Sequence, residues 1–183
     1  MKAFHIKNRK ETRIMENMIA VTKEDIEQAL SEAIFARTYN FNLHSFGSGE
    51  CTLMIPYQEC CIERPGGIVA GAVFMTAADV AMWLAIMTML GKSPMTVTTD
   101  LKTAFISSAK HEDVKCSANI LKMGRSLIYG VAECTNMQNK LLTHHTVTYM
   151  RLSGAVNRTE SGREGNSRAV CGDISLGRSC GPE

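Results

Sequence analysis

The chain has 183 residues, 45% of them hydrophobic, which suffices for one domain with an ordinary core and with extensions at its ends. Its formal net charge is +2 and its basic residues are scattered, so composition gives no sign of a nucleic-acid-binding surface. No apolar run of signal-peptide length follows the first basic residues, and the seven cysteines include no C-x-x-C pair. We therefore expect a reduced, cytoplasmic protein without a disulfide framework or a metal site.

Residues 1–20 come first and lack steady hydrophobic periodicity, so we expect a flexible extension. Thr22 then precedes a basic residue and two acidic residues, a pattern typical of a helix N-terminus. Residues 23–37 are predicted to form an amphipathic helix that packs one face on a sheet. Four apolar residues recur on that face at helical spacing: Ile26, Leu30, Ala33 and Ile34.

Two strands are predicted next. Apolar and polar residues alternate over residues 39–44, and residues 51–57 read as the partner strand. Gly47-Ser48-Gly49 supplies the turn between them. Residues 58–69 then form a loop, in which Pro65-Gly66-Gly67 fixes a tight path into the next helix.

The segment from Ala70 to Leu90 is apolar around every side of a helix, and Asp79 is its only charged residue. Such a helix must be enclosed by protein or by lipid, and about 20 residues are enough to cross a bilayer. A carboxylate near the middle of a membrane span costs roughly 2.5–3.5 kcal/mol, and the strands that follow need an apolar element to wrap around. We therefore expect a helix enclosed by the protein's own sheet, with a membrane span as the alternative.

Four strand-like runs follow, and their short connections predict an antiparallel meander. They cover residues 95–106, 113–123, 126–136 and 141–151. In the first run, alternation predicts one shared face for Val97, Thr99, Leu101, Thr103 and Phe105. His144 and His145 fall on opposite faces of the last run, where each is interpreted as an ordinary strand histidine. The Gly, Ser, Arg and Glu composition of residues 153–183 predicts a disordered tail after a domain at 21–152.

This order of elements, together with two motifs, resembles the hotdog-fold acyl-CoA thioesterases of the PaaI-like (phenylacetate-pathway) type. The motifs are Gly67-x-x-Ala70-Gly71-Ala72, followed after six residues by Asp79, and Val97-Thr98-Thr99-Asp100-Leu101. The family pattern reads G-x-x-H-G-G, six residues and a catalytic Asp, and then T/S-x-D on the next strand. The resemblance covers about residues 25–151. Gly124-Arg125 also falls on a turn that the family tends to carry.

The chain departs from the family pattern at three positions. Ala70 stands where the family has His, Arg64 where it has Asn, and Ala72 where it has the second Gly. The resemblance nevertheless implies an α+β hotdog fold, in which a curved antiparallel sheet wraps one long central helix. It also implies a homodimer with sheets joined edge to edge, or a homotetramer made of two such dimers, with each active site built across the subunit interface. The implied ligand is an acyl-CoA, with CoA as part of the substrate, no separate cofactor, and neither nucleic acid nor membrane as a partner.

Thioester hydrolysis needs an activated water or a carboxylate nucleophile, and a donor for the oxyanion that develops on the carbonyl. The resemblance assigns Asp79 as general base or nucleophile, the Gly71 N–H as oxyanion donor and Thr98 as a group that orients water. It leaves a set of candidates for binding substrate and CoA: Arg64, Gly67, Ala70, Lys122 and Arg125. The plainer interpretations are a hydrogen-bonded buried carboxylate, a glycine at the start of a helix, and solvated surface charges.

Two alternatives to hydrolysis remain. The first is a non-catalytic hotdog protein that binds acyl-CoA or a partner, because Ala70 and Arg64 replace two assisting side chains. The second is hydration or dehydration of an acyl thioester, although the helix carries no paired Asp and His to support it.

Overall fold

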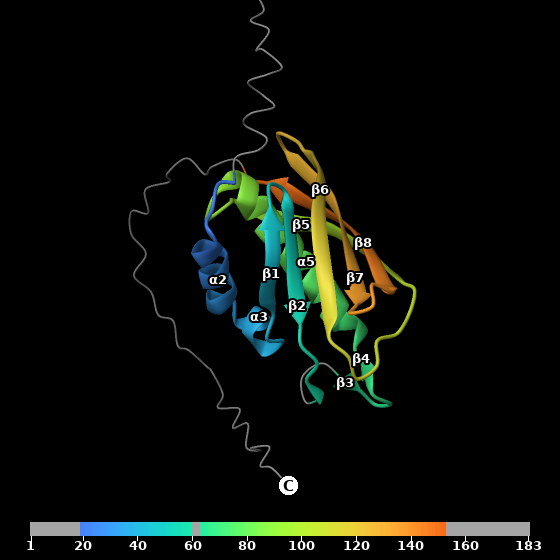
Figure 1. The fold of residues 1–183 in the computed structure, drawn as a ribbon. Coiled ribbons are helices and arrows are strands. Elements are labelled where there is room, and N and C mark those ends of the chain that lie inside the picture. Colours follow the sequence, from blue (N-terminus) through green and yellow to red (C-terminus); the bar gives the residue numbers. More distant parts are fainter. Residues whose placement is uncertain (1–18, 60–62, 153–183) are drawn as a thin grey trace, which may run out of the picture.

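Residues 19–59 and 63–152 are described by the computed structural model of the chain (Figure 1). The expectations for residues 1–18, a flexible extension, and for residues 153–183, a disordered tail, lie outside the described residues. Between these ends, the predicted succession of a helical segment, two strands, a long helix and four strands is confirmed.

The helices are α2 (Lys23–Glu32), α3 (Ile34–Thr38) and α5 (Gly71–Leu90). The long strands are β1 (Asn42–Gly47), β2 (Glu50–Ile55), β5 (Thr96–Phe105), β6 (Val114–Met123), β7 (Leu127–Asn136) and β8 (Leu141–Arg151). A short hairpin, made of β3 (Glu63–Arg64) and β4 (Ile68–Val69), precedes α5.

The six long strands form one antiparallel sheet in the order β1-β2-β6-β7-β8-β5. The predicted meander is confirmed for β6, β7 and β8 but is wrong for β5, which pairs with β8 at the outer edge, while β6 pairs with β2. The segment from β5 to β6 therefore crosses the end of the sheet. Ala109 in this crossing is buried and accepts a hydrogen bond from the Val69 N–H at 3.1 Å, next to the start of α5.

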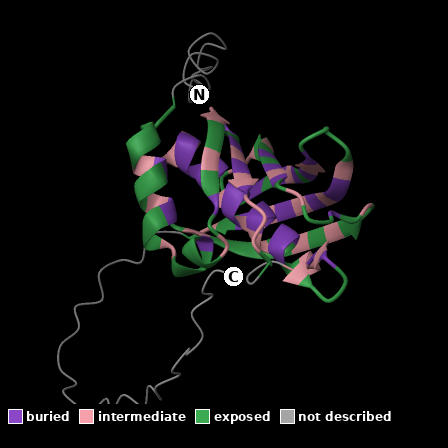
Figure 2. Ribbon diagram, turned by 60° about the horizontal axis from the view of Figure 1, so that its bottom comes forward, coloured by how far each residue is buried: buried purple, intermediate pink, exposed green. Residues whose placement is uncertain are grey.

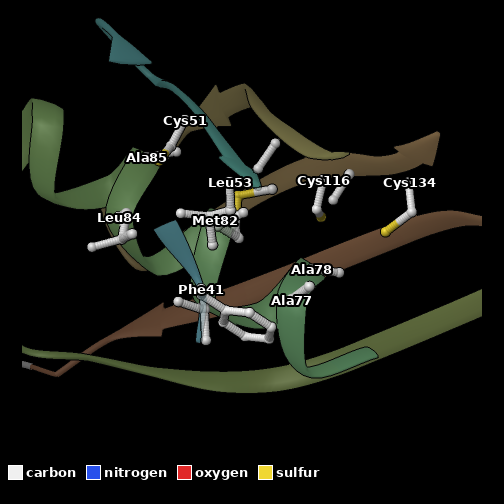
Figure 3. Close-up of a cluster of buried hydrophobic side chains, with 14 of the residues drawn as sticks. Phe41, Cys51, Leu53, Ala77, Ala78, Met82, Leu84, Ala85, Cys116 and Cys134 are labelled. Carbon is white, nitrogen blue, oxygen red and sulfur yellow. The ribbon is translucent and has the colours of Figure 1, made fainter. Parts of the chain in front are cut away.

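Helix α5 lies within the curve of the sheet and contacts all six strands (Figure 1). It is long and apolar enough to cross a membrane, yet 67% of its 18-residue apolar stretch is buried inside the fold. The predicted helix enclosed by the protein's own sheet is thus confirmed. Figure 2 shows the buried residues gathered in the interior, and Figure 3 shows Met82 of α5 beside Leu53 of β2, two members of the same buried cluster.

Truncation of Met82 tests how far this packing stabilises the fold. Its side chain is 1% exposed, so Met82→Ala is expected to lower the free energy of unfolding by about 2–5 kcal/mol, because the removed atoms leave a cavity. Urea unfolding followed by circular dichroism measures the change. Met75→Ala is the matched control on the same helix, since Met75 is 40% exposed and its truncation opens no cavity in the core. Equal losses for both variants would contradict the difference in burial between these two positions of α5.

The helix predicted over residues 23–37 is divided at Ala33, whose extended backbone ends α2 and begins α3. Its predicted start is confirmed by a capping box at Thr22. Because the break changes the direction of the chain, Ile34 points to solvent and is 70% exposed, contrary to its predicted place on the buried face. Ala36 of α3 is buried in its stead.

Strand β5 carries a bulge at Thr99. Strict alternation would put Thr98 and Leu101 on opposite faces of the sheet. The extra residue at the bulge instead places Thr98 on the same face as Leu101. Thr98 consequently lies opposite Tyr149 of β8, a buried residue beside α5. The prediction that alternate residues from Val97 to Phe105 share one face is therefore wrong for Val97 and Thr99. It holds from Leu101 onward.

Candidate active site

Asp79 is partly buried on α5, and two side chains donate hydrogen bonds to its Oδ1. The Thr98 hydroxyl donates from β5 at 2.8 Å, and the Tyr149 hydroxyl donates from β8 at 2.7 Å. Within residues 19–59 and 63–152, no hydrogen-bond donor contacts Oδ2. The carboxylate is thus held by one oxygen, while the other is available to a water or a substrate.

Tyr149 is the residue of this cluster that the sequence did not predict. Its side chain is 4% exposed, and its hydroxyl also contacts the Asp79 backbone carbonyl at 3.1 Å. Burial and the neighbouring carboxylate raise the pKa of Tyr149 well above its usual value, so the hydroxyl keeps its proton and donates. Its inward position on β8 was readable from the alternation, and a buried tyrosine hydroxyl usually requires a polar partner. The sequence alone did not identify Asp79 as that partner.

Tyr149→Phe is expected to lower kcat about tenfold for the thioester hydrolysis that the family resemblance implies, with little change in KM, because a hydrogen bond to a charged group is lost and the carboxylate can rotate. Steady-state kinetics measure this, and the thermal midpoint checks the fold. Tyr129→Phe, on the exposed outer face of β7, is the control. An unchanged kcat for Tyr149→Phe would show that Tyr149 does not orient Asp79.

Asp79 opens into a cavity of about 450 Å³, here named the Asp79 pocket. Its walls come from α3, α5 and β5, and its lining consists of Phe35, Met75, Thr76, Asp79, Thr98 and Leu101. Most of this lining is apolar, and Asp79 is its only ionisable group. Such an environment can hold an uncharged organic group against a carboxylate.

Gly71 is the first residue of α5, and Ala70 is the N-cap without a capping side chain. The N–H of a first helical residue has no acceptor within the helix and lies at its positive end. A Cβ at Gly71 would come within 3.1 Å of the Phe105 ring, so the missing side chain leaves space between the start of α5 and that ring. That space belongs to a second cavity of about 460 Å³, here named the Gly71 pocket. Its lining is Arg64, Ile68, Val69, Gly71, Phe74, Phe105, Ile106, Ser107 and Ser108.

The two central residues of the predicted site do not share a cavity within one chain. Neither the Gly71 pocket nor the Asp79 pocket includes the other residue. Eight residues of α-helix separate Gly71 from Asp79, a rise of about 12 Å. A single thioester carbonyl therefore cannot contact the carboxylate and the Gly71 N–H of the same chain.

Gly67 has a structural reason to be glycine. Its φ is +72°, a conformation that side chains disfavour, and a Cβ there would collide with the His111 ring at 2.3 Å. Gly67 is buried and lines neither the Gly71 pocket nor the Asp79 pocket. Ala70 also lines neither pocket and presents no polar side chain where the family has His.

The predicted basic residues are spread over the molecule. Arg64 is exposed and lines the Gly71 pocket, so the structure brings it near the start of α5. Lys122 is exposed on β6 and lies opposite Tyr129 on the outer face of the sheet, away from α5. Arg125 is exposed in the turn between β6 and β7. Of these three residues, only Arg64 lines a cavity together with a predicted catalytic residue of the same chain, Gly71.

His145 is buried, and both ring nitrogens lie within hydrogen-bond distance of threonine hydroxyls. Thr103 Oγ1 is 2.9 Å from Nδ1, and Thr143 Oγ1 is 2.7 Å from Nε2. These contacts fit the interpretation of an ordinary strand histidine. Among the described residues, no group of three His, Cys, Asp or Glu side chains is arranged to hold a metal ion.

Comparison with known sequences connects this geometry to a family. The family model described as the thioesterase superfamily matches residues 66–143. The matched segment includes Gly71 and Asp79, and it runs on through Thr98. No curated protein matches the chain.

Solved structures agree with the fold. A candidate thioesterase from Silicibacter sp. is 26% identical, with coverage of 75% of this chain and 96% of that chain and a TM-score of 0.67. Zebra fish thioesterase superfamily member 2 is 25% identical, with coverage of 69% and 93% and a TM-score of 0.63. A thioesterase from Haemophilus influenzae is 18% identical, with coverage of 78% and 98% and a TM-score of 0.70. Residues 66–143 thus match the thioesterase superfamily, and the α+β domain built around them has the predicted hotdog fold.

Proposed function

We propose that the protein is an acyl-CoA thioesterase that hydrolyses a thioester to a free acid and CoA. The observation that carries this proposal is the Asp79 carboxylate, held on Oδ1 by Thr98 and Tyr149 at the edge of an apolar cavity. The names of the similar structures, which include thioesterases, support the same reaction. The finer assignment to the PaaI-like type and the cytoplasmic location remain part of this proposal.

The active site would form between two copies of the chain, through β5. This strand is an edge of the sheet and ten residues long, whereas the other edge strand, β1, has six residues and is contacted by α2. A long unpaired edge favours pairing with another strand. The homodimer expected from the family resemblance would therefore be completed by antiparallel pairing of two β5 strands.

One register of such a pair would bring Asp79 of one chain to Gly71 of the other. Along β5, Thr98 marks the position of Asp79 and Phe105 marks that of Gly71. A two-fold pairing centred between Leu101 and Lys102 would set Thr98 opposite the partner's Phe105. Asp79 of one chain would then approach the N–H of the partner's Gly71, and each dimer would contain two composite sites.

In each site, the thioester carbonyl would accept a hydrogen bond from the Gly71 N–H at the positive end of α5. Asp79 would take a proton from water while the water oxygen forms a bond to the carbonyl carbon. The carbonyl electrons move to the oxygen as the oxyanion forms. They return when the C–S bond breaks, and the departing CoA sulfur takes up a proton. Direct attack by Asp79, which forms an anhydride that water then hydrolyses, uses the same two groups.

The CoA phosphates require cationic or hydrogen-bonding groups outside the reacting centre. Arg64, beside the Gly71 pocket, is our first assignment for this role. Lys122 and Arg125 are exposed but line neither pocket, so in the proposal they would serve only where a dimer or tetramer brings them to the site.

The test is release of free thiol from a panel of acyl-CoAs, with oxygen-ester substrates as a comparison. We expect turnover of thioesters that saturates with substrate. Calorimetric binding of a non-hydrolysable thioether analogue runs in parallel. Binding without thiol release from any member of the panel would favour the second candidate, a hotdog protein that binds acyl-CoA without turnover. The observation behind that candidate is Ala70, which offers no polar side chain at the start of α5.

A further inference from the structure

We propose that Phe35 of α3 closes the acyl-binding end of the site and limits the length of an uncharged acyl group. This inference rests on the proposed thioesterase function and specifies the substrate class of the same site. In each composite site, the acyl group would lie in the Asp79 pocket of one chain. The CoA side of the thioester would lie in the Gly71 pocket of the other chain.

Charge separates the two pockets. The Gly71 pocket has Arg64 at its rim and two serine hydroxyls in its lining, whereas the Asp79 pocket has a carboxylate and no basic residue. A phosphate, or an acyl group with its own carboxylate, would therefore meet an unfavourable charge in the Asp79 pocket and find no counterion there. An apolar acyl group meets no such cost.

The walls of the Asp79 pocket indicate which side chain limits its extent. Met75 and Thr76 come from α5, and Thr98 and Leu101 come from β5, the two elements that carry the reacting groups. Phe35 is the one lining residue, among the described residues, that comes from another element. A cavity of about 450 Å³ lies toward the small end of ligand sites, so a wall formed by one aromatic ring has a large effect on what fits.

The position of Phe35 follows from the break at Ala33. α3 is fixed to the core by the buried Ala36, while Phe35 remains 50% exposed and faces the pocket. An aromatic side chain that stays half exposed beside a cavity lacks the hydrophobic stabilisation that burial in the core would supply. A bound acyl chain would cover this ring.

Phe35→Ala tests the assignment with straight-chain acyl-CoAs from acetyl to palmitoyl. We expect the ratio of kcat/KM for long chains to kcat/KM for short chains to rise about tenfold or more, because each methylene that gains space contributes to transition-state binding. Phe35→Trp should move the same ratio in the opposite direction. Ile34→Ala is the matched control, since Ile34 precedes Phe35 on α3, is 70% exposed and does not line the pocket.

The difference in charge between the two pockets is tested separately. Wild-type protein should hydrolyse butyryl-CoA at least about tenfold more efficiently than succinyl-CoA, which carries a carboxylate at its far end. A preference for succinyl-CoA would overturn the assignment of the acyl group to the Asp79 pocket.

Failure of this inference can be told apart from failure of the proposed function. If wild type hydrolyses the panel and folded Phe35→Ala keeps the wild-type length profile, the role of Phe35 is wrong and the thioesterase function stands. If wild type hydrolyses no thioester, the proposed function fails. Calorimetric binding of thioether analogues of increasing length then decides whether Phe35 still limits the pocket, and an unchanged length profile for Phe35→Ala would overturn that too.

Discussion

Asp79→Asn is expected to reduce kcat for acyl-CoA hydrolysis by about 10²–10⁴-fold, the usual contribution of a general base or nucleophile. The amide cannot take a proton from water and cannot form an anhydride. It keeps the size of the carboxylate and an oxygen that can accept the hydrogen bonds of Thr98 and Tyr149, so the fold should persist. Thiol release under saturating substrate measures the change.

Glu133→Gln is the matched control for this substitution. Glu133 is exposed on β7, away from the proposed β5 pairing, and its replacement removes the same charge from the chain without contact to the Asp79 pocket. Its kcat should remain within about twofold of wild type, because surface substitutions have small effects. Equal rates for Asp79→Asn and wild type would remove Asp79 from the mechanism.

Gly71→Pro is expected to lower kcat by about 10²–10³-fold, the usual cost of one lost oxyanion donor. Proline has no N–H, yet it is well tolerated at the first residue of a helix. The preceding Ala70 already has φ −65° and ψ 138°, the extended conformation that a residue before proline prefers. The N–H is thus removed with little expected cost to α5.

Gly71→Ala separates the N–H from the space beside it. Alanine keeps the donor but places a Cβ about 3.1 Å from the Phe105 ring, which has room to move at its exposed edge. We expect a smaller loss of kcat for Gly71→Ala than for Gly71→Pro. If alanine and proline reduce kcat equally while circular dichroism stays native, then space rather than the N–H accounts for the glycine.

Much of the fold was predictable because its signals are local. The apolar residues around Asp79 required an enclosed helix, and Gly47-Ser48-Gly49 correctly located the turn between β1 and β2. The strand before this turn, predicted over residues 39–44, instead runs from Asn42 to Gly47, because α3 extends to Thr38. The pairing of the strands was harder to predict from the sequence. The placement of β5 beside β8 depends on a crossing at residues 106–113, and a short connection in sequence does not reveal that it passes the end of a sheet.

The site was predictable in part. The register of Gly71, Asp79 and Thr98 came from the resemblance, and the contact between Thr98 and Asp79 agrees with it. That contact exists only because of the bulge at Thr99, which alternation cannot foresee. Tyr149 and Phe35 were missed because each meets Asp79 or its pocket from a distant part of the chain.

The most direct test of the account is whether activity returns when two inactive chains are combined. Asp79→Asn and Gly71→Pro chains with different affinity tags are co-expressed, and the mixed dimers are purified through both tags. One composite site of each mixed dimer keeps both groups, so we predict about half of the wild-type activity per dimer. Activity no higher than that of the two parent variants would contradict a site shared between chains.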